Sequence, residues 1–404
     1  MNSDKVFNQI INGIKSIGIY PTIDKPISIH EPFFQDTNAI NYVNDCINTG
    51  WVSSTGKWVN IFEDKISKFT GAKHCVAVNN GTAALKLALH ASGVKTNDEV
   101  IMPPLSFVAT SNAVSHLGAY PHFVDVEKDT YGISSKALST RLEKIGCFRD
   151  GELINKLTGR RISAVIAVHV FGNPADTSSL LEVTSKWNLP LIEDAAEALG
   201  SWNKSTSKRE RTHCGLMGDI GILSFNGNKI ITTGGGGAVI TNDSYKANFI
   251  RHLSTTAKRP HPWEFFHDQI AWNDRMPNLN AALGVSQMEN IDKRLKNKKI
   301  LYEKYKKVFS SIEEVDLIEC NKNSITNNWL ISIRFNSKDY SQVKKYSFEL
   351  LTKAHEVGLF LRPIWKPLNQ LPMYKDCPKG PLLNSEGEFE RILNLPSSPQ
   401  LIKE

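Results

Sequence analysis

The chain has 404 residues, which is longer than a single hydrophobic core usually supports and therefore indicates two domains of unequal size. Apolar residues make up 41% of the chain and charged residues 22%, with ordinary numbers of Gly and Pro, so a disordered chain, a collagen and a disulfide-rich scaffold are excluded. The formal net charge of +7 is a mild excess that would help to attract a polyanionic small ligand, but it is too weak to indicate binding of nucleic acid.

The N-terminal segment and the cysteines contain no targeting or redox motif. Residues 1–27 carry charges where a signal peptide needs an apolar core, and no apolar run is long enough to span a bilayer, so we expect a cytoplasmic protein with no membrane association. The same segment is predicted to be an extension before the first domain. The six cysteines lack CxxC or metal-type spacing, so we expect reduced structural thiols and no metal site: Cys46, Cys75, Cys147, Cys214, Cys320 and Cys377.

Short β-rich runs alternate with helical patterns between residues 75 and 250. Such alternation predicts βαβ units and a mainly parallel sheet, which we assign to a large domain at residues 28–278. In parallel sheets ligands bind beyond the carboxyl ends of the strands, and polar residues gather in the segments that follow these runs. The predicted strands lie at 75–78, 99–102, 122–126, 164–168, 189–193 and 220–225.

The first two of these loops contain possible ligand contacts. Asn79 to Thr82 follow a strand and precede a helix rich in Ala and Leu, so the amides at Gly81 and Thr82 could hold a phosphate group. The same residue types also serve as plain helix-start residues. Phe107, in PPLSFVATSNAV, could cover one side of a flat heteroaromatic ring, although a core phenylalanine is the ordinary alternative.

A later strand, in LPLIEDAAEALGS, delivers Glu193 and Asp194 to its carboxyl end. A buried acid needs a partner there. Pyridoxal phosphate would supply one, because its ring nitrogen must stay protonated if the ring is to accept electrons, and a salt bridge to an Asp achieves this. The simpler alternative is a strand-end acid that caps the next helix.

The stretch GDIGILSFNGNKIITTGGGGAVITND places Lys229 in a polar turn after a strand that ends at Ser224 and Phe225, shortly before four glycines. A surface lysine beside a flexible loop is the alternative interpretation. The glycine run matches neither the dinucleotide-binding GxGxxG nor the phosphate-loop GxxxxGK[ST], so no nucleotide motif is assigned.

The C-terminal third changes character. A long helix-like segment at 279–309 includes the basic run 293–307, which we interpret as a solvated helix face. Alternation at 329–335, a helical pattern at 341–357 and a short run at 359–361 then predict a smaller α+β domain at residues 279–404.

With these features in one order, the sequence resembles the DegT/DnrJ/EryC1/StrS family of sugar aminotransferases. The resemblance runs from Ile29-His30-Glu31-Pro32 to Asn394-Leu395-Pro396-Ser397-Ser398 and includes EDAAEALGS, SFNGNKIITTGGGG, HDQIAWNDRMPNLNAALG and LRPIWKPLNQLPMY at the family's spacing. It implies an α/β protein of the pyridoxal-phosphate-dependent transferase fold type I, which resembles aspartate aminotransferase. It also implies a homodimer whose active sites lie at the subunit interface.

The resemblance also implies roles for individual residues. Lys229 would hold the cofactor in a Schiff base, Asp194 would pair with the pyridine nitrogen, and Glu197 would contact the ring hydroxyl at a position where many members have Gln. Gly81, Thr82 and Ser224 resemble phosphate ligands, and Phe107 resembles the stacking ring. Asn273 would reach the phosphate of the neighbouring subunit's cofactor, while Arg275, Arg362 and Trp365 are candidates for holding the nucleotide diphosphate of the substrate. The family's GYNYR segment reads Ala271-Trp272-Asn273-Asp274-Arg275 here, with Asp274 in place of a common aromatic residue.

Lys229 favours amino transfer, because related dehydratases have His at this position. Within the family the chain is most similar to the LegC type, which implies amination by glutamate at C4 of a nucleotide-linked 4-keto-6-deoxy-N-acetylhexosamine, with the UDP-linked sugar as the expected substrate, in the synthesis of bacterial surface glycans. The alternatives are an aminotransferase for another keto sugar (perosamine-type or C3), another fold-type I enzyme such as a lyase or desulfurase, and a non-catalytic sugar-binding protein. A nicotinamide-dependent dehydrogenase is disfavoured by the missing GxGxxG.

Overall fold

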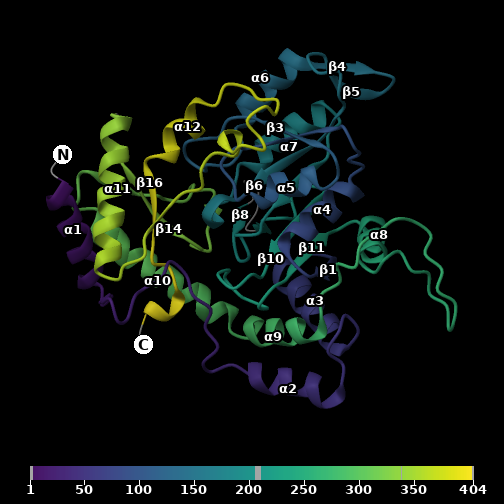
Figure 1. Cartoon of the computed structure of the whole chain (residues 1–404), viewed down its shortest axis with the longest axis horizontal. Helices are drawn as coiled ribbons and strands as arrows, with labels where there is room; N and C mark the ends of the chain where they lie inside the picture. The colour runs from purple at the N-terminus through teal and green to yellow at the C-terminus, as the bar shows by residue number, and fades with distance from the viewer. Residues whose placement is uncertain (1–2, 205–210, 338, 403–404) are drawn as a thin grey trace.

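The structure is a computed structural model, and it describes residues 3–204, 211–337 and 339–402. Its centre is a seven-stranded sheet of order β1-β11-β10-β7-β6-β2-β3. The neighbours from β3 to β10 pair in parallel, whereas β11 is antiparallel to both β1 and β10, so the predicted mainly parallel sheet is confirmed (Figure 1). The strands are β1 (His74–Val78), β2 (Glu99–Met102), β3 (Tyr120–Phe123), β6 (Ile162–Val168), β7 (Leu191–Asp194), β10 (Ile220–Ser224) and β11 (Gly237–Thr241).

Helices cover both faces of this sheet, which explains why its strands are almost continuously apolar. In β6, Ile166 belongs to one hydrophobic cluster, and its neighbours Val165 and Ala167 belong to the cluster on the opposite face. Residues of α3, α4, α5, α8 and α9 complete the first cluster, and α6 and α7 complete the second. The helices are α3 (Lys57–Thr70), α4 (Gly81–Ala91), α5 (Ala109–Ser115), α6 (Ser135–Ile145), α7 (Thr177–Lys186), α8 (Ser244–Ser254) and α9 (Asn278–Met288).

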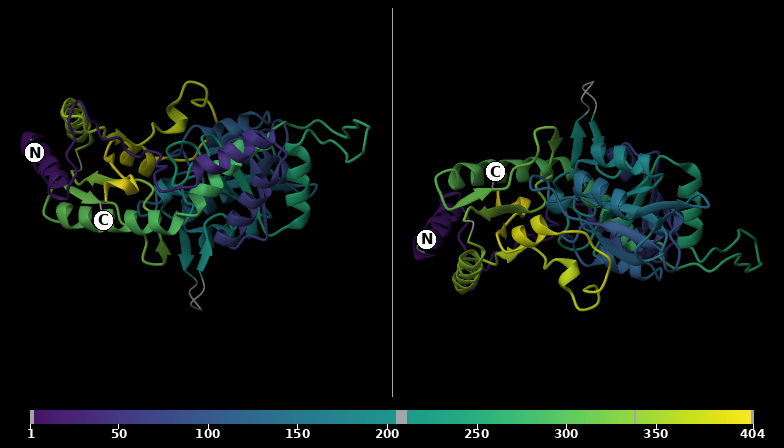
Figure 2. Two further views of the ribbon diagram at one scale, coloured as in Figure 1. Left: turned by 90° about the horizontal axis from the view of Figure 1, so that it is seen from below. Right: turned by 90° about the horizontal axis from the view of Figure 1, so that it is seen from above.

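A smaller body is built around a four-stranded antiparallel sheet of order β12-β14-β16-β15, as expected for an α+β domain. It has its own core, to which Tyr305, Phe309, Ile333 and Leu393 contribute. Figure 2 shows this body at one end of the molecule, with both chain termini on it. Its elements are α10 (Ile291–Phe309), β12 (Val315–Leu317), β14 (Ile331–Phe335), α11 (Tyr340–Glu356), β15 (Arg362–Pro363), α12 (Leu383–Phe389) and β16 (Ile392–Leu395).

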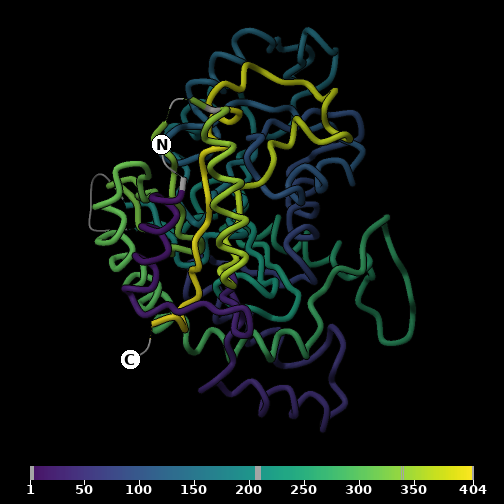
Figure 3. Tube along the Cα trace, turned by 60° about the vertical axis from the view of Figure 1, so that its left-hand side comes forward, coloured from purple at the N-terminus to yellow at the C-terminus, as the bar shows by residue number. Residues whose placement is uncertain are grey.

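Packing refines the division between the two bodies. Ala282 and Val285 of α9 lie in the core of the large body, whereas Leu301 and Tyr305 of α10 lie in the core of the small one. We therefore propose that the small domain begins at α10 rather than at residue 279. The expected N-terminal extension contains α1 (Ser3–Ser16), which contacts α10 and α11 through a buried apolar face and so joins the small body (Figure 3).

The remaining elements are peripheral. An arm formed by residues 255–273 projects from the large body after α8 (Figures 1 and 2). Within the described ranges, no helix is long and apolar enough to cross a membrane. The peripheral elements are α2 (Ala39–Thr49), the hairpin of β4 (Gly146–Arg149) and β5 (Glu152–Asn155), and a small sheet of β8 (Trp202–Lys204), β9 (Arg211–His213) and β13 (Ser324–Ile325).

Candidate active site

A cavity of about 370 Å³ lies where the segments after β1, β2, β7 and β10 meet the small domain. This position follows from the sheet, because parallel strands deliver the residues after them to one common edge. Nine predicted site residues line the cavity: Gly81, Thr82, Phe107, Asp194, Glu197, Ser224, Lys229, Arg362 and Trp365.

The amine of Lys229 points into this cavity from the turn after β10. The backbone amide of Lys229 donates to the Asn226 carbonyl at 3.0 Å, which closes the turn. Its Nζ lies 3.2 Å from Glu197 Oε1 and 3.9 Å from the ring centroid of Trp329. Only 13% of the side chain is exposed, so the surface-lysine interpretation is excluded.

Asp194 ends β7 and is almost fully buried. Its carboxylate accepts hydrogen bonds from Thr110 Oγ1 at 2.8 Å and from the Ala196 amide at 3.2 Å, and among the described residues it forms no ion pair. Burial raises the pKa of this carboxyl above its ordinary value. A buried acid with two donors and no cation fits a ligand that brings a protonated ring nitrogen.

Glu197 approaches Lys229 from the segment after β7. Its second oxygen accepts the Phe171 amide at 2.9 Å, and burial raises the pKa of this carboxyl despite the neighbouring ammonium. Phe171 itself adopts a φ of 59°, an uncommon conformation for a non-glycine residue that turns its amide toward Glu197.

The amino end of α4 forms the opposite wall. Asn80 caps the helix by accepting the Ala83 amide at 2.8 Å, and the amides of Gly81 and Thr82 have no acceptor within the helix. Ser224 faces them closely enough that a Cβ at Gly81 would lie 3.0 Å from its Cβ. Two amides with no acceptor within the helix, a hydroxyl and the positive helix end suit a phosphate group.

The glycine run after Lys229 has a packing role that the sequence did not reveal. A Cβ at Gly237 would lie 2.5 Å from the carbonyl group of Asn80, so only glycine lets β11 pass this close to the start of α4. Gly237 therefore supports the amino end of α4, while Gly235 and Gly236 line the cavity.

Aromatic and basic side chains form the mouth of the cavity. Phe107 is 54% exposed and lines the cavity, so the core-phenylalanine alternative is wrong. Trp365 and Arg362 come from the small domain, where Trp365 packs on Phe171 with ring centroids 5.3 Å apart and Arg362 is exposed on β15. A ligand in this cavity would thus contact both domains.

Arg275 lies outside the cavity of its own chain, so a contact with the substrate in that cavity is not supported, and a contact in a neighbouring subunit's cavity stays a prediction. Its guanidinium donates to Glu63 Oε1 at 2.5 Å and to the Ala77 carbonyl at 3.0 Å, and its side chain is only 8% exposed. Asp274, which replaces the family's aromatic residue, forms an ion pair with Lys86 at 2.8 Å. Arg275 therefore fastens this segment to α3 and β1, and Asp274 fastens it to α4.

Asn273 is exposed at the base of the projecting arm, where it bridges to Thr255 through the backbone. It does not line the cavity of its own chain, and its contact with a neighbouring subunit's cofactor stays a prediction.

Two further residues of the site were not singled out from the sequence. Thr110 was hidden in the small-residue start of a helix, four residues after Ser106, to which it hydrogen-bonds at 2.7 Å. The sequence pattern places Trp329 only at the start of an alternating run. A lone Trp directly after Asn327 and Asn328 was the one local hint that this position differs from an ordinary strand start.

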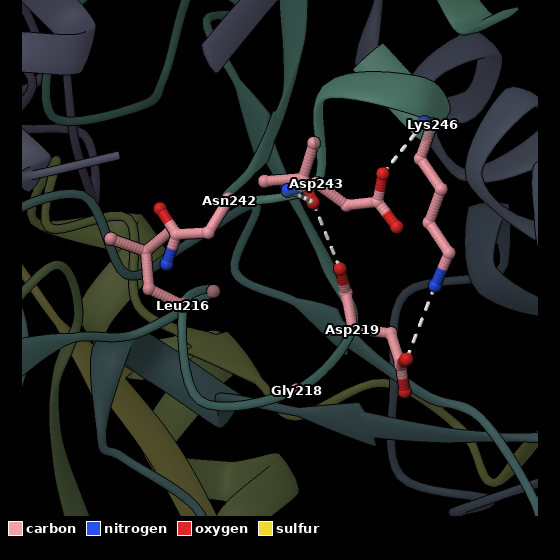
Figure 4. Close-up of a pocket in the computed structure, with 8 residues that line it drawn as sticks. Leu216, Gly218, Asp219, Asn242, Asp243 and Lys246 are labelled. Carbon is pink, nitrogen blue, oxygen red and sulfur yellow. Dashed lines mark hydrogen bonds and ion pairs between the residues drawn. The ribbon is translucent and has the colours of Figure 1, made fainter. Parts of the chain in front are cut away.

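A second hollow, of about 420 Å³, lies at the opposite end of β10 and has a different character (Figure 4). Asp219 is bonded there to Lys246 Nζ at 3.1 Å and to the Leu191 amide at 3.0 Å, and Asp243 caps α8. These acids already have protein partners, so the hollow offers no equivalent of the Lys229 site.

Comparisons with known proteins agree with this geometry. Residues 34–404 match the DegT/DnrJ/EryC1/StrS aminotransferase family. The chain is 33% identical to a GDP-perosamine synthase of Escherichia coli O157:H7 over 94% of this chain and 95% of that protein, and 34% identical to one of Vibrio cholerae over 93% and 95%.

A solved Helicobacter pylori aminotransferase, involved in the biosynthesis of pseudoaminic acid, is 25% identical and superimposes with a TM-score of 0.79 over 92% of this chain and 94% of that one. These matches confirm the predicted fold and cofactor class. The chain therefore belongs to the DegT/DnrJ/EryC1/StrS aminotransferase family and is a pyridoxal-phosphate-dependent sugar aminotransferase.

Proposed function

We propose that the enzyme transfers the amino group of glutamate to C4 of a nucleotide-linked 4-keto-6-deoxy sugar, with UDP-4-keto-6-deoxy-N-acetylglucosamine as the preferred substrate. The observation that carries the proposal is the meeting of Lys229, Asp194, Glu197 and the amino end of α4 in one cavity between two domains. The LegC-like motifs of the sequence supply the choice of sugar.

The donor set of the cavity fits pyridoxal phosphate. Asp194 would pair with the ring nitrogen, Glu197 would contact the ring hydroxyl, and Phe107 would cover the ring. Gly81, Thr82 and Ser224 would hold the phosphate. When bound, the cofactor supplies an electron-accepting ring, and the carboxylate of Asp194 keeps that ring positively charged.

Lys229 would act as the proton carrier in both half-reactions. Its amine takes the Cα proton of the amino donor and later returns a proton on the same face of the site, because it is the one amine among the described residues that line the cavity. Glu197 steadies the amine at 3.2 Å, and the two domains enclose the reacting atoms and limit access of water.

The nucleotide end of the substrate would lie at the mouth of the cavity. Arg362 offers a guanidinium on the small domain that suits a diphosphate, and Trp365 offers an aromatic face beside it. The overall charge of +7 favours the approach of such a dianion.

A GDP-linked 4-keto sugar is the second candidate, and the names of the two GDP-perosamine synthases favour it. The cavity residues that contact the cofactor do not discriminate between the two. Residues near Arg362 that meet the base and the 2-substituent of the sugar would decide.

We also propose a homodimer in which Asn273 completes the partner's site. The arm at residues 255–273 projects away from its own chain, and it carries Trp263, Phe265 and Ile270 with exposed fractions of 80%, 76% and 92%. Apolar side chains exposed to this degree favour a protein contact.

Subunit mixing tests the dimer. Lys229→Ala and Asn273→Ala chains, each inactive alone, should regain about a quarter of the wild-type activity when refolded together, because mixed dimers contain one intact site. No recovery would mean that Asn273 acts within its own chain, and an active Asn273→Ala chain would mean that it has no role in the site.

The substrate is tested with a panel of UDP-, GDP- and dTDP-linked 4-keto-6-deoxy sugars and glutamate, in which product mass and stereochemistry are measured. We expect the highest kcat/KM with the UDP-linked N-acetylated sugar. A preference for the GDP-linked sugar would establish the second candidate, and no turnover with any of them would refute C4 amination.

A further inference from the structure

Trp329 forms part of the wall around the amine of Lys229, although it belongs to the small domain. It directly precedes Leu330 and β14, is only 3% exposed, and lines the cavity. The Lys229 Nζ sits 3.9 Å above its ring centroid while also lying 3.2 Å from Glu197 Oε1. The amine thus lies between an aromatic face and a carboxylate.

The indole is held in this position by the large domain. Its Nε1 donates to the Asn228 carbonyl at 2.7 Å, so it is bonded to the residue directly before Lys229. This bond holds the ring against the same turn that carries Lys229. The distance between the ring and the amine is therefore set in part by the backbone of that turn.

The backbone before Trp329 is fixed just as firmly. Asn327 accepts the Trp329 amide at 2.8 Å and donates to the Glu197 carbonyl at 2.8 Å, while Asn328 adopts a φ of 51°. Gly172 leaves room for this turn, since a Cβ there would lie 2.0 Å from Asn327 Oδ1. A strained turn held by this many bonds is typical of a residue placed for function.

An indole face attracts a cation because the ring carries negative charge above its plane, and the attraction increases when water is excluded. The amine of Lys229 becomes an ammonium each time it takes a proton from a substrate carbon. Among the residues that the structure describes, Trp329 and Glu197 lie directly against this amine and can stabilise that ammonium.

We propose that Trp329 is a positioning residue for amino transfer, whose indole face, together with Glu197, receives the ammonium that Lys229 becomes during each proton transfer. The inference rests on the proposed role of Lys229 and adds to it a partner from the other domain. It implies that the proton carrier depends on correct docking of the small domain.

The first experiment measures the amine itself in the cofactor-free, full-length chain. Competitive labelling of Lys229 with an acylating reagent, quantified by mass spectrometry, reports the fraction of neutral amine. At about pH 8, Trp329→Leu should be labelled roughly five- to thirtyfold faster than wild type, and Trp329→Phe, which keeps an aromatic face, less than about threefold faster.

The pH dependence of the labelling rate distinguishes a change in the charge of the amine from a change in its accessibility to the reagent. A loss of cation stabilisation gives a rate ratio that falls toward one as the pH rises and the wild-type amine also loses its proton, whereas a wider opening gives the same ratio at every pH. Trp365→Leu removes an indole at the mouth of the cavity that packs on Phe171, so it should change access alone, and its rate ratio to wild type should be the same at every pH. A pH-independent ratio for Trp329→Leu would overturn the proposal.

The second experiment measures exchange of the glutamate Cα proton with deuterated solvent, without any keto sugar. Trp329→Leu should lower the exchange rate roughly five- to thirtyfold and Trp329→Phe by less than about threefold. Equal losses in both variants, or a loss of thermal stability alone, would contradict the proposal. The Lys229→Ala variant tests the role of Lys229 separately from that of Trp329. Exchange that persists in this variant would refute Lys229 as the proton carrier.

Discussion

Two acids that follow one another at the end of β7 have opposite surroundings. Glu193 accepts hydrogen bonds from the amides of Gly215, Met217 and Gly218 at 2.6–2.9 Å and lies 3.0 Å from His169 Nε2. Asp194, one residue later, has only two donors and faces the cavity. Consecutive strand residues point to opposite sides of the sheet, so the end of β7 places one acid in a structural network and the next acid in the cavity.

The difference is also electrostatic. Burial opposes ionisation of both groups, yet the bonds from His169 and the Gly218 and Gly215 amides lower the pKa of Glu193 overall, whereas burial raises the pKa of Asp194. A buried acid whose bonds are complete stabilises the fold, and one whose bonds are incomplete is available to a ligand. Variants of this pair and its neighbours test that contrast.

The largest loss of activity is expected when the amine of Lys229 is removed. Lys229→Ala should lower kcat by at least about 10⁴-fold, the upper range for a positioned proton carrier, while the fold is kept. Single-turnover rates with glutamate and far-UV circular dichroism measure the two effects. Near-normal turnover in a folded variant would refute the assignment.

Asp194→Asn should separate function from stability. We expect kcat to fall by about 10²–10³-fold, because the ring nitrogen loses its charged partner. The cofactor-free variant should nevertheless unfold at a higher temperature than wild type, since the buried charge is removed while Asn can accept the Ala196 amide through its oxygen and donate to Thr110 Oγ1 through its NH2 group. Differential scanning calorimetry at pH 7 measures the unfolding temperature, and a lower one would contradict this account of Asp194.

Glu193→Gln should show the converse. An amide group facing the Met217 and Gly218 amides leaves donors opposed to donors, so the free energy of unfolding should fall by about 2–4 kcal/mol. The kcat of the folded variant should stay within about tenfold of the wild-type value, because Glu193 does not line the cavity. Denaturant titration and active-site-normalised rates provide the measurements, and a large loss of kcat at unchanged stability would reverse the roles of the two acids.

Acid titration sharpens the same contrast. The lowered pKa of Glu193 means that its contribution to stability is present above the unfolded value and is lost as the pH falls through the folded one. The raised pKa of Asp194 means that stability decreases as the pH rises from the unfolded value through the folded one. Relative to wild type, the deficit of Glu193→Gln should shrink on acidification, and so should the surplus of Asp194→Asn. Unfolding free energies at several pH values check both signs.

The smallest effect on catalysis is expected at Arg275. Arg275→Ala removes one of two arginines that pair with Glu63, the other being Arg251, so stability should fall by about 1–3 kcal/mol. The KM for the sugar should change less than about twofold, because Arg275 does not line the cavity of its own chain. An increase in KM without destabilisation would support the prediction that Arg275 contacts the substrate.

Local sequence was sufficient for features that depend on chain order. The alternation of apolar strands with helices predicted the sheet, and because parallel strands end at one edge, Gly81, Asp194 and Lys229 were expected to converge there, as they do.

Features that depend on side-chain direction or long-range packing were not predictable in this way. Arg275 shares a segment with Asn273, but its side chain turns toward Glu63, and nothing in the local sequence encodes that direction. Trp329 reaches Lys229 from a different domain, one hundred residues away in the chain. Helix α1 likewise contacts α10 and α11 only through tertiary packing.

Identification of the residue that binds the cofactor tests the central claim most directly. The protein would be saturated with pyridoxal phosphate, reduced with borohydride, digested and sequenced by mass spectrometry. We predict a single modified peptide with the phosphopyridoxyl group on Lys229, and none in Lys229→Ala. Modification of another lysine, or no stable modification, would contradict the account.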